Sequence, residues 1–257
     1  MKLNSVTPKE GLTWIRQGIW LFKQNPLGFL MLVFMYVFVA QLAVIIPVVG
    51  VFAVLLLTPT LSVGFMTACR QAIQKERIRP MVYLVALQSG ALIRKRMMQL
   101  GLVYAALILL MSFALSLLVD FETLLPIMTS DKPITPEALR QIYLILLFGA
   151  ILYIPVAMLM WFSPILVAWA NMPVPQALFS SWLACWTNKT AFFFYLTIWS
   201  AVLIAVPLSI GMVFDALDFG QAASYIVAPL SMAGLTIMHC SFYATWKACF
   251  TEDEVIL

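Results

Sequence analysis

The feature that most constrains this chain is a series of apolar runs, each long enough to cross a lipid bilayer. Six runs lack Asp, Glu, Lys and Arg over all but their ends. About 20 apolar residues in a helix span the hydrocarbon core of a membrane. The sequence therefore predicts an all-α integral membrane protein with six transmembrane helices, at residues 27–46, 48–69, 99–119, 141–170, 191–214 and 222–250.

The composition excludes an ordinary water-soluble domain. Hydrophobic residues make up 63% of the 257 residues, charged residues 10%, and the mean hydropathy is +1.00. Soluble domains are about 45–50% apolar and about 25% charged. The loops are too short to hold a second domain, so we expect residues 1–257 to form a single polytopic membrane domain. The first apolar run is too long for a cleavable signal peptide, which predicts an uncleaved anchor.

The distribution of basic residues predicts how the helices are oriented. With both termini in the cytoplasm, only Lys132 and Arg140 of the 15 Lys and Arg residues lie on the outer side. Cytoplasmic loops of membrane proteins carry such an excess of basic residues. We therefore expect both termini to be cytoplasmic, which an odd number of spans would not allow.

Three stretches, 7–69, 80–170 and 174–250, share one plan, in which an amphipathic segment at the cytoplasmic interface precedes a transmembrane hairpin. The segment near the N-terminus is the clearest, with Leu12, Ile15, Ile19 and Phe22 on one helical face. Tryptophan favours the headgroup level of a bilayer, and four tryptophans in these segments are predicted to be interfacial anchors. They are Trp14, Trp20, Trp182 and Trp186.

The common plan suggests a threefold internal repeat. Pro59 precedes Gly64 by five residues in one hairpin, and Pro229 precedes Gly234 by five in another. Chance similarity between apolar helices is the alternative. Three units of the same orientation would be related by an axis near the membrane normal.

Several of these motifs together carry a family resemblance. They are Trp14-x5-Trp20-Leu21-Phe22-x3-Pro26, the Pro59/Gly64 helix that ends in Cys69-Arg70, and Ala177-x2-Ser180-x7-Asn188. With them, the chain resembles a family of uncharacterised six-helix inner-membrane proteins of Gram-negative bacteria, distantly similar to the YciC-like membrane proteins. The resemblance covers most of the chain and implies a bacterial inner-membrane location, but it supplies no catalytic or ligand-binding residues.

The sequence offers little sign of catalytic or metal chemistry. None of the six apolar runs carries a charge well inside it, which argues against a transporter that couples ions through a buried carboxylate. The single histidine, His239, has no second histidine with which to share a metal, and the four cysteines have no CxxC spacing. We predict a protein that is not an enzyme, with no catalytic, cofactor or metal site. An intramembrane enzyme would need a polar cluster around His239 or Asp120.

Scattered polar residues and prolines within the apolar runs have two interpretations. Interhelical hydrogen bonds and packing kinks are one; a polar groove for a solute or lipid headgroup, framed by broken helices, is the other. The polar residues are Gln41, Ser62, Ser112, Ser116, Tyr153, Ser163 and Thr236, and the prolines are Pro59, Pro155, Pro164, Pro207 and Pro229.

A cytoplasmic basic cluster is the remaining candidate site. It consists of Arg77, Arg79, Arg94, Lys95 and Arg96. These residues orient the chain and are candidates for contact with lipid headgroups or a partner. Nucleic-acid binding is not expected, because the same side chains already serve the membrane interface.

Two functions are compatible with these features. The first is a non-enzymatic scaffold or accessory subunit of an inner-membrane assembly, which would contact the bilayer and a membrane-protein partner or a second copy of itself. The alternative is a small-solute or lipid transporter, or another lipid-handling protein. The alternative requires a polar cavity between the hairpins, whereas a solid core would contradict it.

Overall fold

The computed structural model describes residues 2–119 and 135–251, and the protein is all-α apart from two strands of two residues each. Six of its helical stretches are long and apolar enough to cross a membrane. The fold class and the number of spans are therefore confirmed. The six stretches are Pro26–Val44, Val49–Ile73, Ala91–Ser116, Pro136–Trp169, Lys189–Ala216 and Ala222–Cys249.

The first hairpin consists of α2 (Pro26–Val44) and α3 (Val49–Ile73), and α1 (Glu10–Gln24) precedes it. Asn25 separates α1 from α2, and its side-chain oxygen accepts a hydrogen bond from the Gly28 amide at 3.0 Å. This side-chain cap, followed by proline at the first helical position, is a strong start signal for α2.

The second hairpin pairs α5 (Ala91–Ser116) with α7 (Pro136–Met160), after the short helices η1 (Pro80–Leu84) and α4 (Val85–Gln88). The long fourth apolar run is broken between α7 and α8 (Ser163–Trp169). Ser181 supplies hydrogen bonds to two backbone groups at this break. Its hydroxyl accepts from the Phe162 amide at 3.0 Å and donates to the Met158 carbonyl at 2.7 Å.

The third hairpin is preceded by α9 (Val174–Thr187). Its first limb consists of α10 (Lys189–Ser200), the π-helical turn η2 (Ala201–Ala205) and α11 (Val206–Ala216). Its second limb is α12 (Gly220–Cys249). The π-turn ends just before Pro207, where the missing backbone N–H would interrupt a regular α-helix.

The first and last described residues of the chain lie side by side. Strand β1 (Lys2–Leu3) pairs antiparallel with β2 (Phe250–Thr251), so that Leu3 is opposite Phe250. Asn188 fixes both ends: its side chain donates to the Asn4 carbonyl and contacts the Cys249 sulfur, and its oxygen accepts from the Val6 amide. Adjacent termini fit an even number of spans.

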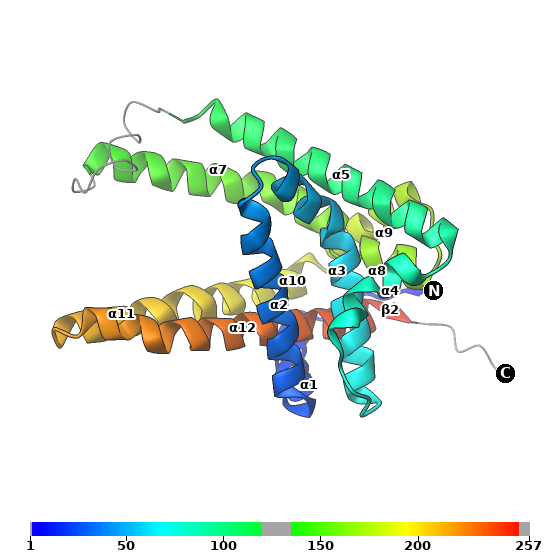
Figure 1. The fold of residues 1–257 in the computed structure, drawn as a ribbon, viewed down its shortest axis with the longest axis horizontal. Helices are drawn as coiled ribbons and strands as arrows, with labels where there is room; N and C mark the ends of the chain where they lie inside the picture. Colours follow the sequence, from blue (N-terminus) through cyan, green and yellow to red (C-terminus); the bar gives the residue numbers. More distant parts are fainter. Residues whose placement is uncertain (1, 120–134, 252–257) are drawn as a thin grey trace.

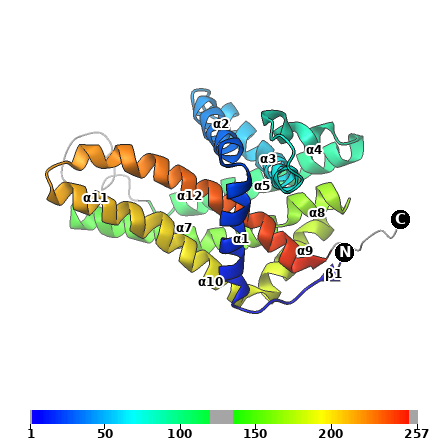
Figure 2. The same cartoon turned by 90° about the horizontal axis from the view of Figure 1, so that it is seen from below.

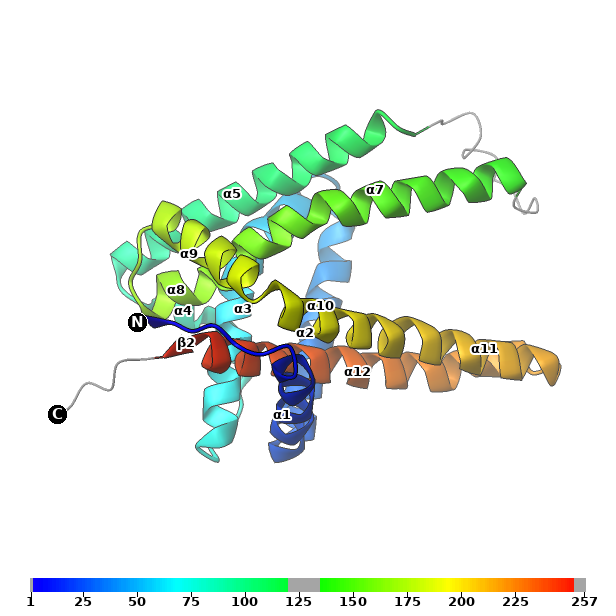
Figure 3. The same ribbon diagram turned by 180° about the vertical axis from the view of Figure 1, so that it is seen from behind.

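The hairpins diverge from the region that holds the termini. In Figures 1 and 3 the α5–α7 hairpin and the α10–α12 hairpin extend in the same direction with a separation between them, and the α2–α3 hairpin crosses them. Seen from below in Figure 2, α1 runs across the near side of α12. We call residues 2–24, 161–188 and 240–251 the base, and residues 106–116, 136–155 and 200–230 the arms.

Helix α1 packs against the rest of the protein through a face that contains two glycines. The face that packs against α10 and α12 carries Gly11, Trp14 and Gly18, while Leu12 and Ile19 are exposed. The two glycines, seven residues apart, let neighbouring backbones approach this face. The interfacial position of α1 stays a prediction. A Cβ on Gly11 would lie 2.6 Å from the Ala191 carbonyl oxygen.

The order of a short helical segment followed by a hairpin recurs three times, but the threefold repeat stays a prediction. The two matching glycines have different surroundings. A Cβ on Gly64 would lie 2.6 Å from the Tyr83 backbone, whereas one on Gly234 would meet only the end of the Leu203 side chain, at 3.0 Å. The shared Pro–Gly spacing therefore does not produce the same contact in the two hairpins.

Candidate functional site

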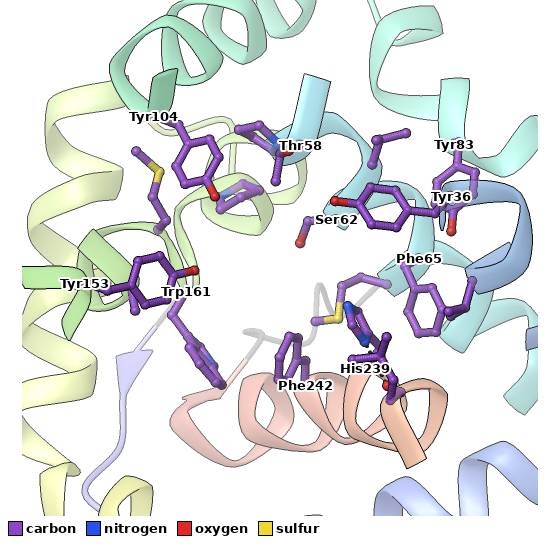
Figure 4. Close-up of a pocket in the computed structure, with 18 residues that line it drawn as sticks. Tyr36, Thr58, Ser62, Phe65, Tyr83, Tyr104, Tyr153, Trp161, His239 and Phe242 are labelled. Atoms are coloured by element: carbon purple, nitrogen blue, oxygen red, sulfur yellow. Dashed lines mark hydrogen bonds between the residues drawn. The ribbon is translucent and has the colours of Figure 1, made fainter. Parts of the chain in front are cut away.

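A cavity of about 340 Å³ lies where the three hairpins meet. Its lining comes from α2, α3, η1, α5, α7, α8 and α12, and from Trp161 at the break between α7 and α8. Figure 4 shows Tyr104 and Tyr153 on one side, Tyr36 and Tyr83 on another, and α12 below. All three hairpins are required to build this site.

The cavity is apolar with a set of uncharged polar groups. None of the lining residues in the described parts of the chain is Asp, Glu, Lys or Arg. Four tyrosines contribute hydroxyls. The Tyr83 hydroxyl donates to the Leu32 carbonyl at 3.0 Å. Burial raises the pKa of Tyr83 well above its usual value, and the neighbouring Tyr36 raises it further, so this hydroxyl remains a donor.

Two hydroxyls from α3 differ in how they are paired. Thr58 donates to the Val54 carbonyl one turn back, at 2.8 Å. Ser62, one turn further along, has no hydrogen-bond partner within the part of the chain that the structure describes, and it lines the cavity. On the opposite wall, Tyr153 interacts with Tyr104. Ser62 is thus free to bond to a ligand.

His239 lies on α12 with its ring between two phenylalanines. The centroid of its ring is 5.5 Å from that of Phe65 and 5.3 Å from that of Phe242. Its Nδ1 lies 2.8 Å from the Leu235 carbonyl oxygen, so the ring is bonded to its own helix. Figure 4 shows His239 and Phe242 rising from α12 into the cavity.

The cavity contains only some of the polar residues and prolines that the sequence singled out. Ser62, Tyr153 and His239 line it, as do Pro59 and Pro164. Two of the other polar residues bond to their own helices, with Ser116 donating to Phe113 and Thr236 to Met232. Ser163, at the start of α8, donates across the break to the Leu159 carbonyl of α7.

Sequence reasoning missed Tyr36, Tyr83 and Tyr104. Tyrosine in a membrane span normally lies at the headgroup level, yet Tyr36 and Tyr104 lie far from the ends of α2 and α5. That mid-span position was the available signal. Tyr83 carried no comparable signal, because it reaches the cavity through the close approach of η1 to Gly64.

The basic cluster lies outside the cavity. Arg77, Arg79, Arg94 and Lys95 are exposed. Arg96 instead fixes the linker before α9, donating from Nη1 to both the carbonyl and the side-chain oxygen of Asn171, each at 2.6 Å. Among the five basic residues of the cluster, Arg96 is therefore the one that contacts this linker in the described structure.

Three of the four predicted interfacial tryptophans reach the surface. Trp20 and Trp186 are each 54% exposed, and the Trp182 ring stacks on that of Trp186 with centroids 6.2 Å apart. Trp14 is fully buried and contacts Phe192 and Tyr195. Trp14 cannot anchor the protein at a lipid interface, because the Gly11–Gly18 face turns its ring into the protein.

The four cysteines are buried and form no disulfides. Burial raises the pKa of the Cys185 thiol well above its usual value, and the nearby Cys249 adds to this effect. Asp120 lies outside the described residues. The described residues contain no group of three His, Cys, Asp or Glu side chains that could hold a metal ion.

Comparison with known proteins gives one informative match. The chain is 38% identical to a probable inner membrane protein of Burkholderia thailandensis, and the alignment covers 99% of this chain and 96% of the relative. No family model matches the sequence, and no solved structure matches it.

Proposed function

The chain belongs to a family of probable bacterial inner membrane proteins, and we propose that it is a non-enzymatic lipid-handling protein of that membrane. The observation that carries the proposal is the cavity of about 340 Å³ at the junction of the three hairpins. Ligand sites in proteins have volumes of about 300–1,000 Å³ and combine an apolar lining with a few polar groups. This cavity meets both criteria.

The lining indicates an amphipathic ligand without charge. Aromatic and aliphatic side chains form most of the wall, and the polar groups are hydroxyls and one imidazole. A phosphate or carboxylate would call for Arg or Lys, and an ion-coupled transporter would call for a buried acidic residue. Within residues 2–119 and 135–251, neither kind of residue lines the cavity.

The proposal includes an orientation. With both termini cytoplasmic, the base lies at the inner interface, where Trp20, Trp182 and Trp186 reach headgroups. The exposed basic side chains Arg77, Arg79, Arg94 and Lys95 then face anionic lipid. In this orientation a lipid enters the cavity sideways, between the arms.

A scaffold or accessory subunit is the competing function. The exposed apolar surface of the arms does not favour it, because lipid-facing helices need the same surface. A scaffold has no use for an internal cavity lined by Ser62 and His239. A partner protein or a second copy, and similarity to the YciC-like proteins, stay predictions.

Purification of the full chain from membranes in mild detergent, followed by native mass spectrometry, tests the proposal. We expect a retained lipid-sized ligand that Ala157→Trp removes, since Ala157 lines the cavity and an indole would fill it. Ala106→Trp is the matched control, because Ala106 is exposed on an arm. Equal retention by the wild type and the Ala157→Trp variant, or no retained ligand in either, would contradict the proposal.

A further inference from the structure

We infer that the ligand of this cavity is an uncharged lipid carrying a free hydroxyl group, and that Nε2 of His239 accepts the hydrogen bond from that hydroxyl. The inference rests on the proposed function and names the chemical class of the ligand. Three features of the cavity determine this class: the tautomer of His239, the fixed position of its ring and the polar groups opposite it.

The contact with Leu235 fixes the tautomer. A backbone carbonyl can only accept, so Nδ1, 2.8 Å from the Leu235 oxygen, must be the N–H donor. No carboxylate among the described residues lines the cavity to pair with an imidazolium, and a neutral ring protonated at Nδ1 leaves a lone pair on Nε2. Nε2 is therefore a hydrogen-bond acceptor.

The packing fixes the direction of that lone pair. Phe65 and Phe242 flank the ring, and the Leu235 contact ties its Nδ1 edge to α12. Among the described residues, Nε2 has no hydrogen-bond partner, and the side chain reaches into the cavity. An unpaired acceptor in apolar surroundings is costly, and a ligand that donates a hydrogen bond removes that cost.

The other walls supply donors. Ser62 has a free hydroxyl, and the Tyr104 and Tyr153 hydroxyls lie across the cavity from α12. A ligand hydroxyl can donate to Nε2 and accept from one of these groups. An ester or ether can only accept and would leave Nε2 unpaired. A quaternary ammonium group would suit the aromatic walls, but it has no proton to donate to Nε2.

The test compares two probes on the full chain in phosphatidylcholine nanodiscs. One is a long-chain alcohol with a photoreactive diazirine in its alkyl chain; the other is the methyl ether of the same molecule. We expect the alcohol to crosslink to peptides of α7 and α12 that line the cavity. Half-saturation for the ether should require a concentration higher by about tenfold, the effect of one hydrogen bond.

Two variants assign the effect to His239. His239→Phe keeps an aromatic ring but removes the acceptor, and we expect it to weaken alcohol labelling by about tenfold and to abolish the difference between alcohol and ether. Phe194→Leu, at an exposed position on α10, is the control and should behave as the wild type. The comparison of probes on the unmodified protein remains decisive if His239→Phe does not fold.

The outcomes separate the inference from the proposed function. Equal labelling of the cavity by alcohol and ether, or an unchanged alcohol preference in His239→Phe, overturns the inference but leaves the cavity as a lipid site. Preferential labelling by a probe with a choline head overturns it in favour of an ammonium ligand. Labelling that avoids the cavity and is unaffected by Ala157→Trp overturns the proposed function itself.

Discussion

The base and the arms differ in how much of their apolar sequence is buried inside the protein. The base contains many of the fully buried large side chains, including Trp14, Phe162, Leu166 and Trp246. Among the described residues of the arms only Ala138 and Ala223 are buried. The hydropathy of a side chain does not predict whether it faces lipid or the protein interior, because the two are similar solvents for apolar groups.

The hydrogen bonds of polar side chains also differ between the base and the arms. Asn188 in the base is fully buried and bonds to residues at both ends of the chain. Ser209 in an arm is exposed and bonds only to the Ala205 carbonyl of its own helix. The base is thus specified by contacts between distant segments, whereas the arms need only to be helical and apolar. The cavity lies where one region gives way to the other.

The largest difference in unfolding free energy between the base and the arms should come from truncating aromatic side chains. Trp246 is fully buried against Phe162, Trp169 and Phe250, so Trp246→Ala should lower the free energy of unfolding by about 3–5 kcal/mol. Phe113 on an arm is 64% exposed, and Phe113→Ala should cost less than about 1 kcal/mol. Unfolding in mixed detergent micelles measures both. Similar losses of unfolding free energy for the two variants would contradict the difference in packing between the base and the arms.

Replacing glycine with alanine should change the free energy of unfolding in opposite directions in the base and in the arms. A Cβ on Gly18 would lie 2.5 Å from the Ser241 Cβ and 2.9 Å from its Cα. Gly18→Ala should therefore lower the free energy of unfolding by about 2–3 kcal/mol. Gly211 on α11 has nothing within 4 Å of that position, and Gly211→Ala should raise it by about 0.5–1 kcal/mol, since alanine favours the helix. The same unfolding assay applies, and a stabilised Gly18→Ala variant would show that α1 does not pack closely on α12.

Removing a polar side chain should give the smallest of the three effects. Asn188→Ala would leave the Val6 amide and the Asn4 carbonyl without the partners they have now. We expect a loss of about 2 kcal/mol in the free energy of unfolding and faster proteolysis of the N-terminus. Ser209→Ala should change stability by less than about 0.5 kcal/mol. If the N-terminus of Asn188→Ala stays protected from proteolysis, contacts other than those of Asn188 hold it against the C-terminal strand.

The parts of the structure that sequence reasoning could reach follow from local rules. The six spans follow from uninterrupted hydropathy, and the break near Trp161 follows from an apolar run too long for one straight span. The rest depends on contacts between helices. Gly11 and Gly18 determine which face of α1 is buried. The cavity is built from residues on separate helices, such as Tyr36 and Tyr104, with no common spacing in the sequence.

The separation of the arms is the feature on which both the comparison and the lipid proposal depend. Spin labels at Leu147 on α7 and Leu208 on α11, both exposed, allow it to be measured by pulsed electron paramagnetic resonance in nanodiscs. The native cysteines are buried and should compete little for the label. The account predicts arms held apart by intervening lipid. Distances that place the two helices in direct contact, with axes about 8–10 Å apart, would contradict it.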